Sequence, residues 1–335
     1  MTTVTAADAA PKGHAARLGA HAYPDLDGAR SRRHAHRPIW RLRLLAWREY
    51  LRRRNALSGV DTMVNFVGYP RSGHSLVGSI LDGHPEAVLS HELDAMGLLL
   101  KGVPAAHLPA LMAWQSEQFT AAGRWWNGFR YDIGTGHHGM AGRPRVVGDK
   151  KGDWAARWFA MDPSLADRLD RESPLRTAWI LVTRHPLDNV ATMSLRKNGA
   201  YDRLRIAHSG TGGFGAALAA AQQAGDIARE ARADMVADWQ AMTAAVAGMK
   251  ARVPADRWFE LVYEDFVADP TAECARLAAF LGLNAPADWL SAAAASVRPS
   301  SRRSRDAVAW PPDLAATIAE TVARTDFLRA YADDL

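Results

Sequence analysis

The chain has 335 residues, 48% of them hydrophobic and 23% charged, and it carries a net charge of +5 at pH 7. This composition is ordinary for a globular protein with a full hydrophobic core, and it predicts one large α/β domain. The single cysteine, Cys274, excludes an internal disulfide and fits a reducing cytoplasm. No apolar run reaches the roughly 20 residues that span a bilayer, and the N-terminus lacks the apolar core of a secretion signal. We therefore expect a cytoplasmic protein.

The N-terminal part of the chain is its most basic region. Residues 1–35 are rich in Ala, Gly and His without apolar periodicity, which predicts a flexible leader. Between Arg30 and Arg54 there are ten arginines and one acid. Apolar residues recur among them at helical spacing, namely Ile39, Trp40, Leu44, Trp47 and Leu51. This pattern predicts a basic amphipathic helix at about 38–54.

Such a helix suits more than one partner. Nucleic acid is disfavoured because no recognised DNA- or RNA-binding module accompanies the arginines, and we expect no nucleic-acid partner. The helix would then lie on an anionic membrane surface, which would make the protein peripheral on the inner face of the membrane. Alternatively, it packs on its own domain with a solvated arginine face. The sequence leaves these two readings open.

Strands and helices alternate from residue 62 onward. Strands are expected at 62–68, 87–90, 145–148 and 176–183, and helices at 74–84, at 106–122, from Asp153 and from about Leu187. This alternation predicts an α/β fold of three layers, in which helices flank a central, mostly parallel sheet. Ligands of such sheets lie at the carboxyl ends of the strands.

The second half of the chain begins with a glycine cluster at 208–213, which predicts a mobile loop. This loop is either a lid over the substrate or a linker without function. We expect one long helix at about 215–249 to follow it, then a strand at 257–263 and a helix that ends near 280–283. Residues 36–335 are accordingly treated as a single domain with helical insertions.

A candidate phosphate-binding loop follows the first strand. It reads "VGYPRSGHS" (67–75), with Gly68 and Gly73 spaced as in phosphate-binding loops. In such a loop consecutive backbone N–H groups point to one place, and the next helix adds its positive N-terminal end. Ser72 and Ser75 add hydroxyl donors. The loop is thus expected to hold a phosphate.

The cation of this loop is not where a nucleotide kinase has it. A kinase needs a lysine before the final hydroxyl and an acid that holds magnesium. Here His74, mostly neutral at pH 7, takes the place of the lysine, and the cation is Arg71. Arg71 and Asp149 would have to be recruited for phosphoryl transfer, so a P-loop kinase is the less favoured reading.

A second phosphate site is indicated by "LVTRHPLDNVATM" (181–193). A strand ends in Arg184, and eight residues later Thr192 places a hydroxyl on the first turns of a helix. Arginine makes forked, charge-assisted hydrogen bonds to phosphate. The alternative is an ordinary ion pair between Arg184 and Asp188.

Together these motifs resemble the sulfotransferase superfamily that uses 3′-phosphoadenosine 5′-phosphosulfate (PAPS), with local similarity of "PRSG" and "LDGHPE" to the protein-tyrosine sulfotransferase branch. The resemblance implies a P-loop fold in which the first loop binds the 5′-phosphosulfate. It also implies that Arg184 and Thr192 bind the 3′-phosphate, Thr192 standing where Ser is commoner. The loop residues implied in donor binding are Arg71, Ser72, Gly73, His74 and Ser75. His74 departs from the common pattern, which has Thr or Ser there.

Two further segments resemble parts of the same donor site. "LVYEDFVADP" (261–270) implies that Tyr263 lies near the adenine, where its ring offers a face to the base. "SSRRSR" (300–305) resembles the basic stretch that closes over the 3′-phosphate, with Arg302 and Arg303 as donors. Its alternative is a solvated basic loop.

The resemblance also implies the reaction chemistry, which is in-line transfer of a sulfuryl group to a hydroxyl or amine. In "GDKKGDW" (148–154), Lys150 would reach the sulfonate or the bridging oxygen beside Arg71. Glu92 is the expected base, with a pKa raised by burial towards the working pH. His91 is its neighbouring competitor, and Asp153 is the third choice.

The acceptor and the partners are less determined. Trp125, Trp126, Trp154 and Trp158 flank the expected cleft, and their rings suit sugars or aromatic rings, but they also fill cores. A small molecule, a carbohydrate, a lipid-linked acceptor or a peptide tyrosine is compatible. No metal is expected, because the pair His137 and His138 lacks a third ligand and reads as a glycine-flanked surface turn. A non-catalytic member of the family, binding nucleotide or a membrane surface, is the alternative to the enzyme.

Overall fold

The computed structural model describes residues 38–126, 129–140, 142–197, 199–208, 213–226, 229–298, 301 and 303–335. The leader expected at 1–35 lies outside these residues. Within the described part of the chain, no helix is both long and apolar enough to cross a membrane.

Five parallel strands form the central sheet. Their order is β2-β5-β1-β6-β8, with bounds Ala87–Ser90, Val146–Asp149, Thr62–Gly68, Arg176–Thr183 and Trp258–Val262. β1 is buried along its whole length, as expected for a strand covered on both faces. It pairs with β6 from Thr62 opposite Arg176 to Gly68 opposite Val182. The loops that follow β1 and β6 therefore begin side by side at one edge of the sheet.

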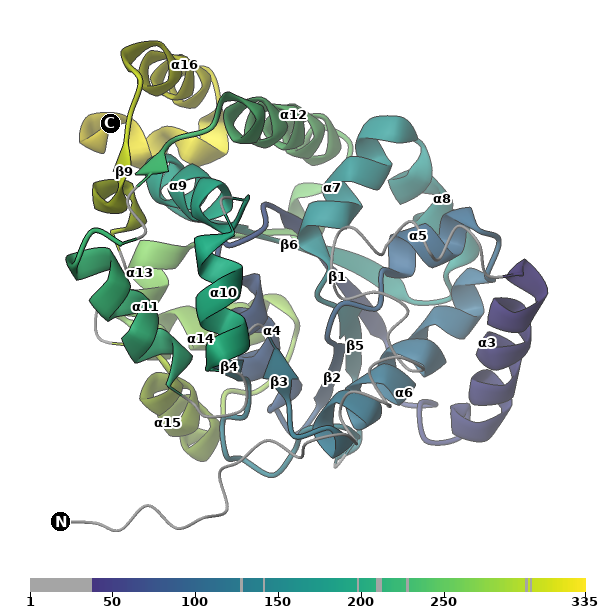
Figure 1. Cartoon of the computed structure of the whole chain (residues 1–335). Coiled ribbons are helices and arrows are strands. Elements are labelled where there is room, and N and C mark those ends of the chain that lie inside the picture. Colours follow the sequence, from purple (N-terminus) through teal and green to yellow (C-terminus); the bar gives the residue numbers. More distant parts are fainter. Residues whose placement is uncertain are drawn as a thin grey trace, which may run out of the picture.

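Helices cover both faces of this sheet, as Figure 1 shows. Alternate residues of β1 point to opposite layers, Val64 and Phe66 to one core and Met63 and Val67 to the other. The first layer contains α4 (His74–Asp82), α13 (Tyr263–Ala268), α14 (Pro270–Phe280) and α15 (Ala287–Ser296). The second contains α5 (Ala95–Leu100), α6 (Leu108–Ala121), α7 (Gly152–Met161), α8 (Leu165–Glu172), α12 (Ala233–Lys250) and α16 (Pro312–Ala323). The predicted three-layer α/β fold is confirmed.

Two further groups of elements complete the fold. α3 (Ile39–Arg53), the predicted basic helix, packs against α6 at the periphery of the domain (Figure 1). α9 (Pro186–Lys197), α10 (Ala200–Ala207) and α11 (Phe214–Gln223) share a small core of their own. The lone Cys274 is buried in α14.

The prediction of one long helix at 215–249 is wrong. α11 ends at Gln223, and Gly225 has a φ of +75°, a left-handed conformation that stops a helix. The chain then forms the short strand β7 (Arg229–Glu230), which pairs with β9 (Val308–Ala309), before α12 begins. α8 and α10 were not predicted either. Most of the predicted glycine loop, 209–212, lies outside the described residues.

Candidate active site

The loop between β1 and α4 (residues 69–73, the β1–α4 loop) has the backbone of an anion-binding turn. Arg71 and Gly73 have φ values of +72° and +108°, which turn the chain back on itself. Arg71 adopts this conformation at a cost of about 1 kcal/mol, because a Cβ crowds the carbonyl there. No side chain caps the N-terminus of α4, which begins at His74. The N–H groups at the start of α4 are thus available to an anion.

The two serines of this motif have different partners. Ser72 is fully buried and its hydroxyl donates to the Tyr69 carbonyl at 3.0 Å, so it braces the loop from inside. This differs from the expectation that it offers a donor to phosphate. The Ser75 hydroxyl instead accepts a 2.9 Å hydrogen bond from Nζ of Lys150. Ser75 therefore connects α4 to the end of β5.

His74 is a packed, neutral residue. A Cβ added at Gly152 would lie 2.3 Å from its Cε1 atom, and one at Gly68 would lie 3.4 Å from its Nε2 atom. The ring edge also contacts Phe66, with centroids 5.6 Å apart. Burial, and after it the charge of the neighbouring Lys150, lower the pKa of His74 to about 3. His74 can contribute its backbone N–H to an anion but no positive charge.

Arg71 is oriented by a residue that sequence reasoning missed. Its guanidinium donates to the Tyr201 hydroxyl at 2.5 Å and lies 5.1 Å from the centroid of the Tyr201 ring. Nε of Arg71 is buried without a hydrogen-bond partner. Tyr201 belongs to α10, and because that helix was not predicted, nothing in the sequence linked it to the loop.

The second motif meets the β1–α4 loop at the edge of the sheet. Nη1 of Arg184 lies 3.4 Å from the carbonyl oxygen of Arg71. The guanidinium of Arg184 is 5.9 Å from the centroid of the Tyr263 ring. This ring packs on the loop, since a Cβ added at Gly73 would be only 2.4 Å from its Cδ2 atom. Tyr263 thus brings together the three sequence motifs at 67–75, 181–193 and 261–270.

Thr192 and Asp188 are engaged within the protein. The Thr192 hydroxyl donates to the Asp188 carbonyl at 2.9 Å, one turn back in α9. The Asp188 carboxylate accepts from the backbone N–H of Arg305 at 2.8 Å and lies 3.8 Å from its guanidinium. Among the described contacts Asp188 is therefore bound to Arg305, and the alternative of an ion pair with Arg184 is not found.

In the described part of the basic C-terminal stretch, Arg305 is the arginine that contacts α9, through Asp188. Arg302 lies outside the described residues. Arg303 has 62% of its side chain exposed and pairs with Asp306 at 3.1 Å. Arg305, with 11% exposed, contacts Asp188 and also Asp334 at 2.9 Å. The sequence offered no signal to choose among these arginines, because their burial depends on how 304–307 docks on α9.

The predicted base lies at the centre of a buried ionic cluster. Lys150 and Lys151 each donate through Nζ to one carboxylate oxygen of Glu92. The side chain of Lys150 is 3% exposed, and those of Glu92 and Lys151 are each 13% exposed. Through Lys150, Glu92 is connected to Ser75 in the first turn of α4. Glu92 and Lys150 are therefore in direct contact, and the expectation of a raised pKa for Glu92 is wrong.

Burial alone would raise the pKa of Glu92, but the charges of Lys150 and Lys151 outweigh it and hold the pKa well below its usual range. Burial lowers the pKa of Lys150 in spite of Glu92. The pKa of Lys151 is raised, because Glu92 and Asp153 together overcome the effect of burial. The expectation of a raised pKa is wrong because it rested on burial of the carboxylate alone, without the charges of these two lysines.

Asp149 organises the backbone that carries Glu92. Its Oδ1 accepts from the Ser90 hydroxyl at 2.8 Å and from the N–H of Leu93 at 2.9 Å, and its Oδ2 accepts from the N–H of Ala95 at 2.8 Å. Glu92 itself has a φ of +71°, so its loop needs this support. Asp149 was considered only as a magnesium ligand, but both its oxygens serve the fold.

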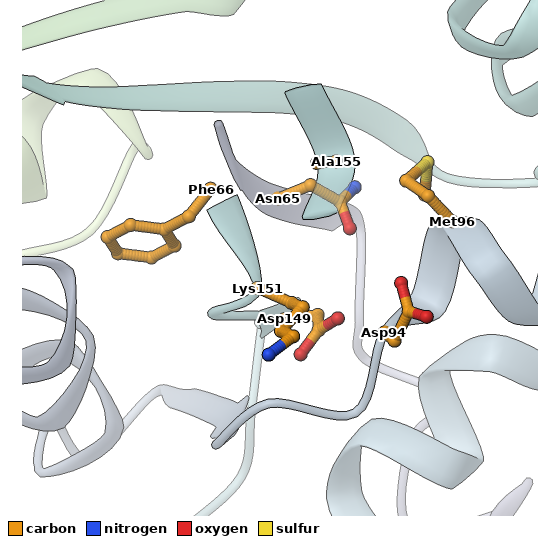
Figure 2. A pocket seen from close by; sticks show the side chains of 7 residues that line it. All are labelled: Asn65, Phe66, Asp94, Met96, Asp149, Lys151 and Ala155. Atoms are coloured by element: carbon orange, nitrogen blue, oxygen red, sulfur yellow. The ribbon is translucent and has the colours of Figure 1, made fainter. Parts of the chain in front are cut away.

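A small pocket lies beside this cluster, and Figure 2 shows that the polar residues Asn65, Asp94, Asp149 and Lys151 line it together with Phe66, Met96 and Ala155. The Asp94 carboxylate accepts from the N–H of Gly97 and, at 2.8 Å, from Nε1 of Trp158. Burial raises the pKa of Asp94 to about 6, although Lys151 opposes the shift. Trp158 is thus used in positioning the acid that begins α5.

His91 and Asp153, the alternatives to Glu92 as the base, lie in other surroundings. The His91 ring is buried and stacks on Phe119 with centroids 4.2 Å apart, and Trp126 contacts it edge-on at 5.4 Å. Burial lowers the pKa of His91 well below its usual value, and its Nε2 has no partner. Asp153 lies in the first turn of α7, where it helps to raise the pKa of Lys151.

Of the four tryptophans that were expected to flank the cleft, only some lie near the ionic cluster. Trp126 lies near the cluster, with Nζ of Lys150 6.0 Å from its ring centroid. Trp125 is its half-buried neighbour in the short strand β3 (Trp125–Trp126). Trp154 packs against Trp158 in α7 with centroids 5.2 Å apart. The structure therefore brings Trp126 to the ionic cluster and uses Trp158 to hold Asp94.

The chain turns at 138–140, as expected for the histidine pair at 137–138, but His138 is not on the surface. His138 is buried, its Nδ1 lies 3.3 Å from Asp82, and its Nε2 accepts from the N–H of Ile133. Asp82 also binds the buried Arg124 at 2.7 Å, so the group anchors the 124–138 segment to α4. Among the described residues there is no cluster of three or more His, Cys, Asp or Glu that would hold a metal ion.

Comparison with known proteins identifies similarity in the second half of the chain. Residues 176–287, which include Arg184, Thr192 and Tyr263, match the model of a family described as "Sulfotransferase family". No curated protein matches the sequence.

Several solved structures are similar over most of the chain. The sulfotransferase domain of the olefin synthase of Synechococcus PCC 7002 is 15% identical, with 82% of this chain and 94% of that chain covered and a TM-score of 0.41. Sulfotransferase STF9 from Mycobacterium avium is 12% identical, with 92% and 85% covered and a TM-score of 0.45. Mouse sulfotransferase SULT7A1, complexed with PAP, is 13% identical, with 82% and 88% covered and a TM-score of 0.41.

Proposed function

We propose that the protein transfers the sulfuryl group of PAPS to a hydroxyl or amine of an acceptor, and the match of residues 176–287 to the model of the sulfotransferase family supports this. The observation that carries this proposal is the meeting of two phosphate-binding elements across one tyrosine ring. Arg184 lies 3.4 Å from the carbonyl oxygen of Arg71, and Tyr263 packs between the two segments. PAPS carries phosphates on the 5′ and 3′ sides of a single adenosine, so it requires two such elements close together.

The donor would bind across this junction. The backbone of the β1–α4 loop and the start of α4 suit the 5′-phosphosulfate, with Arg71 supplying the positive charge. Arg184 and Thr192, with Arg302 and Arg303 from the basic stretch, suit the 3′-phosphate. Tyr263 offers its ring to the adenine. No metal ion is needed in this scheme, since arginine, lysine and N–H groups provide the positive charge.

Lys150 occupies the position between donor and base. It contacts both Ser75 of α4 and Glu92. A sulfonate bound at the β1–α4 loop would offer Lys150 a second anion, and turning towards it would weaken its hold on Glu92. The pKa of Glu92 would then rise from its depressed value, because only Lys151 would remain as its partner. Donor binding would in this way make Glu92 a stronger base.

The transfer itself needs few groups. Glu92 takes the proton of the acceptor hydroxyl as the new S–O bond forms. The S–O bond to the 5′-phosphate breaks in line with it, and the electron pair goes to the phosphate oxygen. Lys150 and Arg71 stabilise the charge that develops on the sulfonate and on this leaving oxygen. Adenosine 3′,5′-bisphosphate and the sulfated acceptor are the products, and the acceptor class we propose is a small molecule, a carbohydrate or a lipid-linked molecule.

The rival reading as a kinase is weakened by one observation. Asp149, the acid that magnesium would require, directs both carboxylate oxygens to Ser90, Leu93 and Ala95. The non-catalytic alternative predicts the same donor site without turnover.

Calorimetric titration separates these readings. We expect adenosine 3′,5′-bisphosphate to bind with micromolar affinity and ATP with magnesium to bind at least about 100-fold more weakly, because ATP has no 3′-phosphate for Arg184. Transfer of labelled sulfonate from PAPS to members of an acceptor panel then distinguishes an enzyme from a binding protein. Binding of ATP in preference to the bisphosphate would overturn the proposal.

A further inference from the structure

The basic helix α3 presents its apolar side chains to solvent. Seven large hydrophobic side chains are exposed in the described part of the chain, and five of them lie on α3. The most exposed are Trp40 (58%), Leu44 (54%), Trp47 (53%) and Leu51 (41%), and Ile39 lies at the end of the helix. The first four are spaced by four, three and four residues, so they form one stripe along a single face. Trp40, Leu44, Trp47 and Leu51 are called the α3 stripe below.

The opposite face of α3 is the one that holds the helix to the domain. Leu42 and Ala46 are buried against the core. Glu49, which is 0% exposed, binds Arg53, and Arg53 reaches Glu117 of α6 at 2.5 Å. Rolling α3 to bury the stripe would break this buried ionic contact and leave charges without partners. Because the opposite face of α3 is fixed to the domain, the α3 stripe points to solvent.

The exposed charges of α3 are all positive. Five arginines of this helix and its end are exposed, namely Arg41, Arg43, Arg48, Arg52 and Arg54. Of these, Arg48 also binds Glu49 at 3.0 Å and Arg43 donates to the Gly102 carbonyl at 2.8 Å. The only acid in the same segment is the buried Glu49. Two copies of this face would bring ten arginines together, which disfavours self-association through it. A negatively charged surface would complement the positive charge of this face.

We propose that α3 docks the protein on an anionic lipid bilayer, with the α3 stripe inserted between headgroups and the arginines at their phosphates. Tryptophan is suited to this depth because its ring is apolar and its N–H is polar. Arginine bears a fork of donors that matches phosphate. The axis of the stripe, from Trp40 to Leu51, covers about 17 Å, long enough to lie along a membrane surface.

A vesicle flotation experiment with the full chain tests this. Vesicles of equal parts phosphatidylglycerol and phosphatidylcholine are compared with vesicles of phosphatidylcholine alone. We expect binding to the anionic vesicles and little to the neutral ones. Raising the salt from 0.1 M to 1 M shortens the screening length from about 10 Å to about 3 Å and should release most of the protein.

Two pairs of variants separate the stripe from general effects. Trp40→Ser with Trp47→Ser should weaken the binding to anionic vesicles by about 30-fold or more, because two large apolar surfaces no longer enter the bilayer. Its matched control is Met161→Ser, since Met161 is exposed by 63% at the far end of α7. Arg52→Glu with Arg54→Glu should abolish binding, whereas Arg324→Glu with Arg329→Glu, exposed on other elements, should leave it intact.

Three results would overturn the proposal. The first is failure of the native protein to float with anionic vesicles. The second is equal flotation of the native protein and the doubly substituted tryptophan variant. The third is a dimer in sedimentation experiments that the tryptophan substitutions convert to a monomer, since this would assign the stripe to a second copy of the chain. Unchanged thermal unfolding of the variants would show that their loss of binding is not a loss of folding.

Discussion

Replacing Glu92 by Gln is the sharpest test of the proposed chemistry. The change keeps the size of the side chain and removes the carboxylate that binds Lys150 and Lys151. If Glu92 takes the acceptor proton, kcat should fall by about 10²–10⁴-fold, which corresponds to about 3–5 kcal/mol in the barrier. Affinity for adenosine 3′,5′-bisphosphate should change by less than about 5-fold, because Glu92 contacts the lysines and not the β1–α4 loop.

The same substitution should have a recognisable effect on stability. Two ammonium groups, 3% and 13% exposed, lose the carboxylate they share. Removing one member of a buried ion pair typically costs about 3–5 kcal/mol, and we expect a loss of free energy of unfolding at the lower end of this range because Lys150 keeps Ser75. Bisphosphate should stabilise the variant more than the native protein, since its anion approaches the unpaired lysines.

Urea unfolding with and without bisphosphate, together with single-turnover transfer from PAPS, measures these quantities separately. Glu117→Gln is the matched control, because Glu117 also pairs with a buried cation, Arg53, but does so on α6. It should lose stability without losing kcat. Near-normal turnover in folded Glu92→Gln would refute the assignment of the base and transfer that role to Asp153 or His91.

Three further predictions follow from the same geometry. Arg184→Ala should weaken bisphosphate binding by about 2–4 kcal/mol, roughly 30- to 700-fold by calorimetry, because a phosphate loses its forked partner; unchanged affinity would show that the 3′-phosphate site is misplaced. Asp149→Asn should lower kcat and leave the bisphosphate Kd nearly unchanged, because one oxygen that accepts from the N–H groups carrying Glu92 is lost; an effect on Kd alone would contradict its positioning role. The pKa of His74 lies at about 3 in the folded protein, so the unfolded chain binds an extra proton below pH 6.5. Stability should therefore fall as the pH falls, by about 2 kcal/mol between pH 6.5 and 5 from His74 alone, and His74→Gln should reduce this slope in urea unfolding at the two pH values.

The ion pairs of Glu92 add a pH dependence of another kind. The pKa of Glu92 is depressed in the folded protein, so its contribution to stability is fully present above the pKa it has when unfolded. This contribution is lost only as the pH falls below about 4, in the range where carboxylates protonate. Between pH 5 and 8 the difference in stability between the native protein and Glu92→Gln should therefore stay constant.

The fold could be predicted where a short-range pattern was strong. The strands at 62–68 and 176–183 are continuous apolar segments, and the structure has both at the same residues. Helix boundaries were less certain where alanine and glycine dominate, as at 215–249. There, apolar periodicity continued across Gly225, but the left-handed backbone of that glycine ends α11 and lets β7 pair with β9.

Some site residues were invisible to sequence reasoning because their roles depend on distant contacts. Tyr201 contacts Arg71 from 130 positions away, on a helix that was not predicted. In the sequence, nothing distinguishes Arg305 from the neighbouring arginines. In the structure, residues 304–307 pack on α9, and the Arg305 guanidinium is buried beside Asp188. Asp149 lies next to Lys150 in the sequence, but its partners at 90–95 are on another strand and the loop after it.

The sequence by itself determined the main strands at 62–68 and 176–183, the positions of the two candidate phosphate motifs and the basic character of α3, because these depend on the spacing of neighbouring residues. Only the tertiary structure decided how the charges are paired. Glu92 and Lys150 are 58 positions apart, yet parallel pairing of β2 with β5 brings both to one edge of the sheet. This contact reverses the pKa expected for a buried carboxylate, because the pKa responds to the charges nearest in space.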